Sequence, residues 1–197
     1  MIKRFKFIIN RILLFYLNYR YGYIKGRGVN IIGSNCIINK NVVVGDFSSL
    51  ICGEYGTIII KSGSSIGRDS WIAAGDGEII VGNDCLFGPR ITIVSQNHCT
   101  QPVTNVSFLP WDRDSISVKT VIGNRCHLGA NVTVLPGTIL GDYCVVGANS
   151  VVSGSFDDGS IIVGIPGKVV KKYKCDKDDF GEFTGIPPYL HTSNRFF

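Results

Sequence analysis

Aliphatic side chains recur at every sixth position in the second half of this chain, without a slip from Ile122 to Val152. A small or branched residue follows the first five of them four positions later. An α-helix repeats every 3.6 residues and a β-strand every 2, so neither element alone produces a period of six. A coil of very short strands joined by tight turns does produce it. The pattern therefore predicts an all-β solenoid, the hexapeptide β-helix, with both sets of side chains turned inward: Ile122, Leu128, Val134, Leu140, Val146 and Val152, and Cys126, Val132, Thr138, Cys144 and Ser150.

The same period appears upstream in three shorter blocks, and its phase is lost most widely around residues 97–119. In a solenoid, such a break is a loop that protrudes at one face, often the face that binds a ligand. We expect one solenoid domain over residues 29–172, with an excursion loop at about 96–120. A short helical segment over residues 1–28 precedes it, and an irregular tail over residues 173–197 follows it.

The excess of positive over negative charge lies at the beginning of the chain. Of the 20 basic residues, seven lie in Met1–Arg27, which holds no acidic residue. The other 170 residues therefore hold 13 basic and 15 acidic side chains, which is close to neutral. A nucleic-acid-binding protein needs a basic face on its folded body, so we expect no nucleic-acid partner.

The basic segment Met1–Arg27 has a broad apolar face at helical spacing. Basic residues interrupt it before it is long enough to span a bilayer, and no cleavage site of a signal peptide follows. Two interpretations stay open: a helix that caps the end of the solenoid, or an amphipathic helix that lies on an anionic membrane surface. These two roles do not exclude each other.

The seven cysteines show neither a CxxC pair nor a metal-ligand spacing, so we expect no metal site. Four of them fall on the small interior position of the repeat, where we expect small buried hydrophobic side chains. Free thiols are typical of a reducing cytoplasm, which is where we expect this protein. These four are Cys36, Cys85, Cys126 and Cys144.

Histidine is the side chain best suited to accept a proton near neutral pH, and the chain has three. His98 lies where a regular block gives way to the excursion loop, a boundary at which catalytic groups are often found. A loop histidine is also commonly just solvated, and position alone leaves both interpretations open. His127 occupies an outward slot before Leu128, which predicts a surface or interface side chain, and His191 lies in the tail.

Three motifs resemble those of the hexapeptide-repeat acetyltransferases: residues 121–137 (VIGNRCHLGANVTVLPG), residues 146–152 (VGANSVV) and residues 164–171 (GIPGKVVK). In pattern the chain is most similar to the maltose, galactoside and xenobiotic O-acetyltransferases and their bacterial surface-polysaccharide cousins. The resemblance covers about residues 29–172 and implies a left-handed parallel β-helix. It implies acetyl transfer from acetyl-CoA to a sugar hydroxyl, with His98 as the catalytic base.

The resemblance also implies where acetyl-CoA binds. In this family the cofactor lies in a groove between adjacent solenoids of a homotrimer, which places its pantetheine along Gly129–Ala130 and Gly147–Ala148. Lys168 and Lys171 match the basic residues that reach its phosphates, and Ser153 stands in place of the threonine of a common Thr–Lys pair. His127 takes a slot that is usually tryptophan.

The acceptor is less well defined. Within the excursion loop, Trp111 and Asp112 combine an aromatic plane with a carboxylate, which together with Asn97 suits a sugar. A loop that packs trimers together explains the same aromatic residues equally well. The polar residue that holds the sugar in maltose and galactoside enzymes has no match near Ala73 and Ala74, which argues against those two acceptors.

We therefore expect an acetyl-CoA:sugar O-acetyltransferase of surface-polysaccharide or lipopolysaccharide biosynthesis, cytoplasmic or peripheral to the inner membrane. An amino-sugar N-acetyltransferase and a non-catalytic docking solenoid are the alternatives. A covalent route through Cys99, activated by His98, is chemically conceivable, but the family does not use it.

Overall fold

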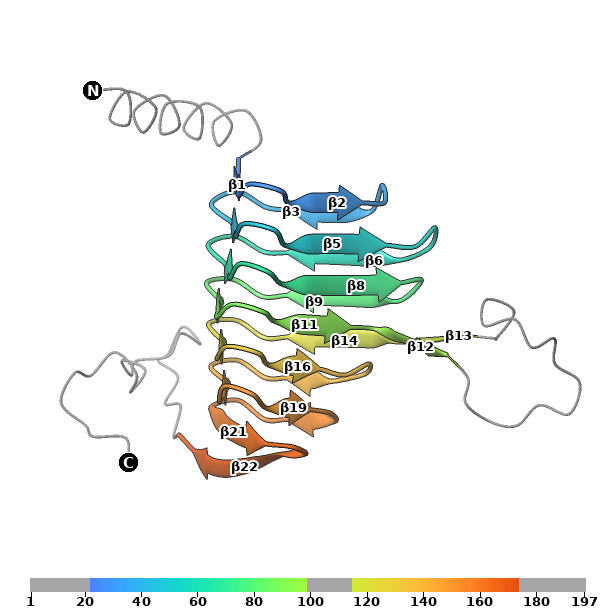
Figure 1. Cartoon of the computed structure of the whole chain (residues 1–197). Coiled ribbons are helices and arrows are strands. Elements are labelled where there is room, and N and C mark those ends of the chain that lie inside the picture. Colours follow the sequence, from blue (N-terminus) through green and yellow to red (C-terminus); the bar gives the residue numbers. More distant parts are fainter. Residues whose placement is uncertain (1–21, 99–114, 174–197) are drawn as a thin grey trace, which may run out of the picture.

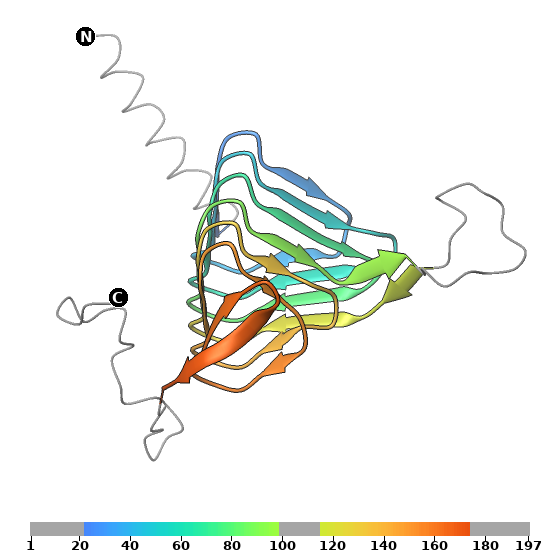
Figure 2. The same cartoon turned by 60° about the horizontal axis from the view of Figure 1, so that its bottom comes forward.

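The computed structural model describes residues 22–98 and 115–173. These residues form strands and turns that wind as a left-handed parallel β-helix of about five turns. Figure 1 shows the coils stacked along one axis, and Figure 2, turned toward that axis, shows a prism of triangular section. The predicted fold class is confirmed.

Three parallel sheets, here called faces A, B and C, form the sides of the prism. Face A contains β1 (Ile24–Lys25), β4 (Val43–Val44), β7 (Ser65–Ile66), β10 (Leu86–Phe87), β15 (His127–Leu128), β18 (Val145–Val146), β21 (Ser160–Gly164) and the antiparallel β22 (Gly167–Lys172). Face B contains β2 (Asn30–Ile32), β5 (Ser49–Cys52), β8 (Trp71–Gly75), β11 (Thr92–Val94), β16 (Thr133–Val134) and β19 (Val151–Val152). Face C contains β3 (Cys36–Ile38), β6 (Thr57–Ile60), β9 (Glu78–Val81), β14 (Lys119–Ile122), β17 (Ile139–Leu140) and β20 (Ser155–Phe156).

The aliphatic positions of the repeat fill the prism in stacked columns. On face B, register pairs place Leu50, Ile72, Ile93, Val134 and Val152 in one column, and each side chain is 0% exposed. Burial of such a side chain contributes about 1.5–3 kcal/mol, so these columns supply much of the stability of the coil. The predicted inward set of the repeat is confirmed.

The small interior positions form a polar seam inside this apolar core. Ser64 Oγ donates a hydrogen bond to the Gly82 carbonyl (2.7 Å) and accepts one from the Cys85 N–H (3.0 Å). The thiol of Cys85 in turn donates to the Gly123 carbonyl, with 3.1 Å between Sγ and O. Cys126 and Cys144 continue this seam in the following coils. Three of the four predicted interior cysteines are buried, and Cys36 is partly buried.

The solenoid begins before residue 29, because β1 pairs in register with β4 through Ile24 and Val43. It ends with the hairpin of β21 and β22, close to the expected boundary at residue 172. Within the described residues, no helix is long and apolar enough to cross a membrane. The N-terminal segment expected to be helical lies outside the described residues, as does the tail beyond Tyr173.

Candidate functional site

The excursion loop leaves the solenoid as a two-stranded hairpin at the edge between faces B and C (Figure 2). β12 (Gln96–His98) pairs antiparallel with β13 (Ser115–Ser117), and His98 lies opposite Ser115. The hairpin strands therefore carry both ends of the expected loop outward, and His98 stands at the end of the paired segment.

Two buried hydroxyl groups fix the root of this hairpin. Ser95 Oγ donates to the Ala74 carbonyl of the preceding coil (2.8 Å). Thr120 Oγ1 donates to the Val94 carbonyl (3.0 Å) and accepts the N–H of Gly137 from the following coil (3.1 Å). Both side chains are 0% exposed. Because three coils are tied together here, the strand that carries His98 leaves the solenoid in a fixed direction.

His98 is exposed, and its backbone N–H donates to Asn97 Oδ1 (2.9 Å). Gln96 holds the same strand to the neighbouring coil, because its Oε1 accepts the N–H of Asp76 (3.1 Å). The position suits a base that must reach a ligand outside its own prism. Cys99, Trp111 and Asp112 lie outside the described residues.

His127 is half-buried on face A, with Leu86 and Val145 as its register neighbours. Burial lowers the pKa of its imidazole, so the neutral form is favoured at neutral pH. His127 lies on the outward side of its strand, as predicted. Its neighbours bury it more than is usual for a surface residue.

The edge between faces A and B carries the other predicted site residues, Gly129–Ala130 and Gly147–Ala148, and we call it the Gly–Ala edge. A Cβ added at Gly129 would lie 2.6 Å from the backbone nitrogen of Ala148, so successive corners stack in direct contact. The Asn149 N–H donates to the Ala130 carbonyl (2.9 Å), which continues the contact. Small residues thus leave a smooth edge on which an extended ligand can lie.

The C-terminal hairpin closes face A beside this edge. Gly164 donates its N–H to Ser150 Oγ (3.0 Å), which ties the hairpin to the last coil. Lys168 and Lys171 are exposed on β22, and the ammonium of Lys171 lies 5.3 Å from the centre of the Tyr173 ring. The adjacent Lys172 instead pairs with Asp157 (2.8 Å), which raises the pKa of the lysine through their hydrogen bond. Ser153 is exposed after β19.

A single chain does not bring the predicted base and the predicted cofactor residues together. His98 follows β11 at the edge between faces B and C, whereas Gly129–Ala130 precedes β16 at the Gly–Ala edge. The register of Thr92 with Thr133 puts Ala130 opposite Pro89, nine residues before His98 along the same coil. Within one chain the two sets of residues therefore lie on opposite sides of face B.

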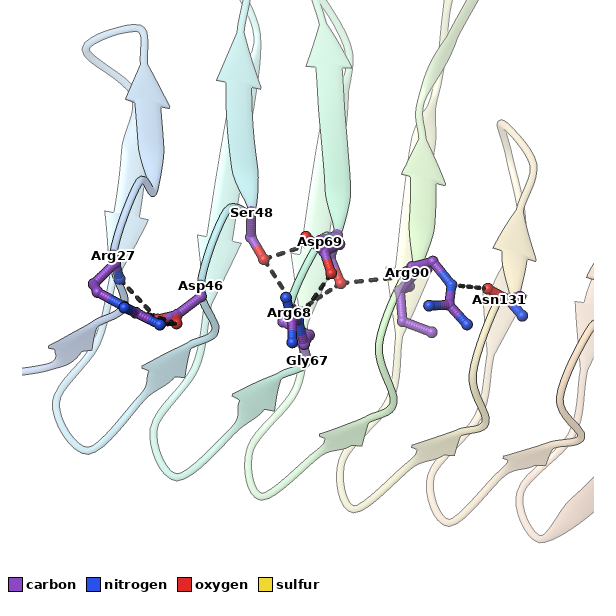
Figure 3. Close-up of polar contacts among 10 residues, drawn as sticks. Arg27, Asp46, Ser48, Gly67, Arg68, Asp69, Arg90 and Asn131 are labelled. Atoms are coloured by element: carbon purple, nitrogen blue, oxygen red, sulfur yellow. Dashed lines mark hydrogen bonds and ion pairs between the residues drawn. The ribbon is translucent and has the colours of Figure 1, made fainter.

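Sequence analysis missed a line of charged residues along the Gly–Ala edge. Arg90 and Asn131 are 41 residues apart, yet Arg90 Nε donates to Asn131 Oδ1 (2.6 Å; Figure 3). The position of Arg90 within the six-residue repeat could have revealed it, because Asn131 and Asn149 occupy the same position in the next two coils. Among the described residues, no group of three or more His, Cys, Asp or Glu side chains forms a metal site.

Comparison with known proteins confirms the resemblance. Residues 119–154 match the family model "Bacterial transferase hexapeptide (six repeats)". The chain is 43% identical over 99 residues to "Putative lipopolysaccharide biosynthesis O-acetyl transferase WbbJ" of Escherichia coli, covering 48% of this chain and 50% of that protein. It is 34% identical over 105 residues to the galactoside O-acetyltransferase of Lactococcus lactis, covering 53% and 47%. The chain thus spans about half the length of the curated relatives it matches.

Among solved structures, the fold is similar to that of AntD, an N-acyltransferase from Bacillus cereus crystallised with dTDP and coenzyme A. The TM-score is 0.66 at 22% identity, and the match covers 77% of this chain and 81% of that one. At this identity the likeness shows the β-helix fold.

Proposed function

We propose that this chain is an acetyl-CoA-dependent sugar O-acetyltransferase whose active sites lie between chains of a homotrimer. The observation that carries the proposal is the pairing of two features: an exposed histidine on a rigidly rooted hairpin, and a smooth Gly–Ala edge that ends in exposed lysines. A structural solenoid needs neither feature. The two curated relatives described above, both named as O-acetyltransferases, support the hydroxyl acceptor.

The residues at the Gly–Ala edge fit coenzyme A in shape and charge. Ala130 and Ala148 offer small side chains and backbone amides along which pantetheine can extend, with Ser153 near its path. Lys168 and Lys171 lie at the C-terminal end, where their ammonium groups can contact the nucleotide phosphates without a demanding geometry. Gly129 and Gly147 let the coils approach closely, which keeps this edge continuous.

In the proposed reaction, His98 of one chain removes the proton of an acceptor hydroxyl. The hydroxyl oxygen attacks the thioester carbonyl carbon, a C–O bond forms, and the C–S bond breaks. The coenzyme A thiolate leaves and recovers the proton from the imidazolium. A base held in this way contributes about 10²–10⁴-fold to the rate. Asn97 and the loop residues Trp111 and Asp112 are the proposed acceptor contacts.

We propose the trimer because the resemblance implies it and because the hairpin of one prism could then meet the Gly–Ala edge of another. Three copies arranged head to tail in a closed ring allow this contact for every chain. We place the enzyme in the cytoplasm, on the biosynthetic route to a surface glycan, with residues 1–27 as the segment that could contact an anionic membrane.

Thermal unfolding with coenzyme A tests the proposal. A ligand that binds only the folded protein raises Tm by mass action, so millimolar coenzyme A should raise Tm by several degrees. Removing both ammonium groups with Lys168→Gln and Lys171→Gln should reduce the increase. If coenzyme A leaves Tm unchanged, the chain is a non-catalytic solenoid and the proposal is wrong.

A further inference from the structure

The Gly–Ala edge continues past its small residues, toward the N-terminus, as a line of charged side chains (Figure 3). Main-chain hydrogen bonds between successive coils align the corners that carry these side chains. The Arg90 N–H donates to the Arg68 carbonyl (2.8 Å), and the Asn131 N–H donates to the Pro89 carbonyl (3.0 Å). In register, Asp69, Arg90 and Asn131 therefore follow one another at the coil spacing of about 4.8 Å, with Arg68 and Ala130 one residue before this column.

The first arginine of this line has a structural partner. Asp46 receives the backbone N–H of Arg27 on Oδ1 (2.8 Å) and the Arg27 guanidinium on Oδ2 (2.9 Å). The backbone hydrogen bond is the main cause that lowers the pKa of the Asp46 carboxyl, and the guanidinium adds to it. The charge of Arg27 is thus compensated within the edge.

Arg90 has no such partner. No carboxylate of a described residue lies within 4.0 Å of its guanidinium, and its side chain is exposed. Its Nε is held by Asn131, whose Nδ2 donates onward to Asn149 Oδ1 (2.9 Å). The hydrogen bonds from Arg90 to Asn131 and from Asn131 to Asn149 hold the guanidinium through its Nε. Its two terminal nitrogens point away from Asn131.

Local backbone preference does not explain this arginine. Arg90 has φ +58°, in the left-handed region, and so do Asn131 (+58°) and Asn149 (+61°) in the next coils. Asparagine tolerates this conformation better than arginine does. Phe47 and Arg125 adopt the same conformation, so the indication of a ligand comes from the exposed guanidinium of Arg90, which Asn131 holds and which has no carboxylate partner among the described residues.

Two further exposed side chains lie close in register to Arg90, in the preceding coil. Arg68 lies one coil away, with its Nε on Asp69 (2.9 Å) and its side chain 63% exposed. Trp71, on β8, is 49% exposed and pairs in register with Thr92, two residues after Arg90. Arg90 itself lies in the bend that precedes β11.

The position of Arg90 relative to bound coenzyme A indicates which ligand it contacts, and this step rests on the proposed function. Coenzyme A placed with its phosphates on Lys168 and Lys171 runs along Ala148 and then Ala130, so its acyl end points toward the next coil. Arg90 lies in that coil. The group that Arg90 meets is therefore part of the acceptor.

We propose that Arg90, held by Asn131, binds the diphosphate of an acceptor sugar that is linked through this diphosphate to a carrier. A guanidinium fork pairs with phosphate oxygens through two parallel hydrogen bonds, which suits a planar, fixed arginine. Trp71 packs against the carrier next to the diphosphate. Nucleotide-linked and lipid-linked sugars share this chemistry.

Isothermal titration of the full chain, saturated with coenzyme A, against inorganic pyrophosphate tests the site directly. Arg90→Gln removes the charge and should weaken pyrophosphate binding about tenfold or more, because a charge-assisted pair is lost. Asn131→Ala should weaken it less, since the guanidinium stays but is no longer held. Arg125→Gln is the matched control: Arg125 also has φ +54° and the same charge, but lies at the edge between faces C and A beside Tyr143. It should leave the affinity unchanged.

Equal affinity of wild type and Arg90→Gln, or no saturable binding of millimolar pyrophosphate by wild type, would overturn the proposal. Coenzyme A is titrated separately. If it fails to bind while pyrophosphate binding still depends on Arg90, the proposed function fails and the anion site stands.

UDP and farnesyl diphosphate then identify the carrier. If UDP binds more tightly than pyrophosphate and Trp71→Ala removes the difference, the acceptor is nucleotide-linked; the same result for farnesyl diphosphate indicates a lipid carrier. Equal affinities for all three probes would support the diphosphate contact and overturn the role of Trp71.

Discussion

The hydroxyl of Thr120 should link the stability of the solenoid to the placement of His98. Thr120→Val keeps the shape of the side chain but removes the donor to the Val94 carbonyl and the acceptor of the Gly137 N–H. Each lost hydrogen bond costs about 0.5–1.5 kcal/mol, and a buried group left unpaired costs about 1–3 kcal/mol. We therefore expect the free energy of unfolding to fall by about 2–4 kcal/mol. Because the same bonds fix the root of the hairpin, kcat should fall as well, with little change in the KM for acetyl-CoA.

Thr138→Val is the matched control for this prediction. Thr138 occupies the same inward column one coil later, is also 0% exposed, and donates to the Leu135 and Val152 carbonyls (2.7 and 3.2 Å). It should destabilise the solenoid without affecting kcat, whereas Thr120→Ser should restore both properties. Urea unfolding and steady-state release of free thiol measure the two effects. The reasoning is refuted if Thr120→Val and Thr138→Val lower kcat equally.

Three other variants test separate parts of the site. Gly129→Val should lower the free energy of unfolding by more than about 2 kcal/mol, because its side chain must displace the backbone of Ala148; circular dichroism during thermal unfolding measures this. Lys168→Gln with Lys171→Gln should weaken coenzyme A about tenfold or more in equilibrium titration, and equal affinity would remove the lysines from the site. Because burial lowers the pKa of His127 in the fold, stability should be full above pH 6.5 and should fall as the pH drops through the folded pKa; His127→Gln should flatten that fall in unfolding measured between pH 7 and 5.

The regular part of the fold could be predicted from sequence because each coil repeats the same local rule. An aliphatic residue every six positions is enough to predict that Leu128 and Val134 lie inside, and both are buried in the prism. The rule says nothing of contacts that join distant coils. In the sequence, Thr120 looks like any other small inward residue. Its hydrogen bond with the Gly137 N–H depends on how two coils align.

The candidate site was predictable only in its separate parts. Family motifs pointed to His98 and to Gly129–Ala130, but only the prism shows that they lie on different edges. Arg90 was missed because its partner Asn131 follows 41 residues later, beyond the excursion loop. Its chemistry depends on stacking of coils, which a local pattern does not encode.

The measurement that tests the account most directly is complementation between two inactive variants. His98→Ala removes the base and leaves the Gly–Ala edge intact, while Ala148→Trp blocks the edge and leaves His98 intact. Each variant alone should lose at least about 10²-fold in acetyl transfer, the contribution of a general base. Refolded together in equal amounts, they should form mixed trimers in which one of three sites has both working halves, so that about a quarter of wild-type activity returns. A mixture that forms trimers but stays as inactive as its components would contradict a site shared between chains.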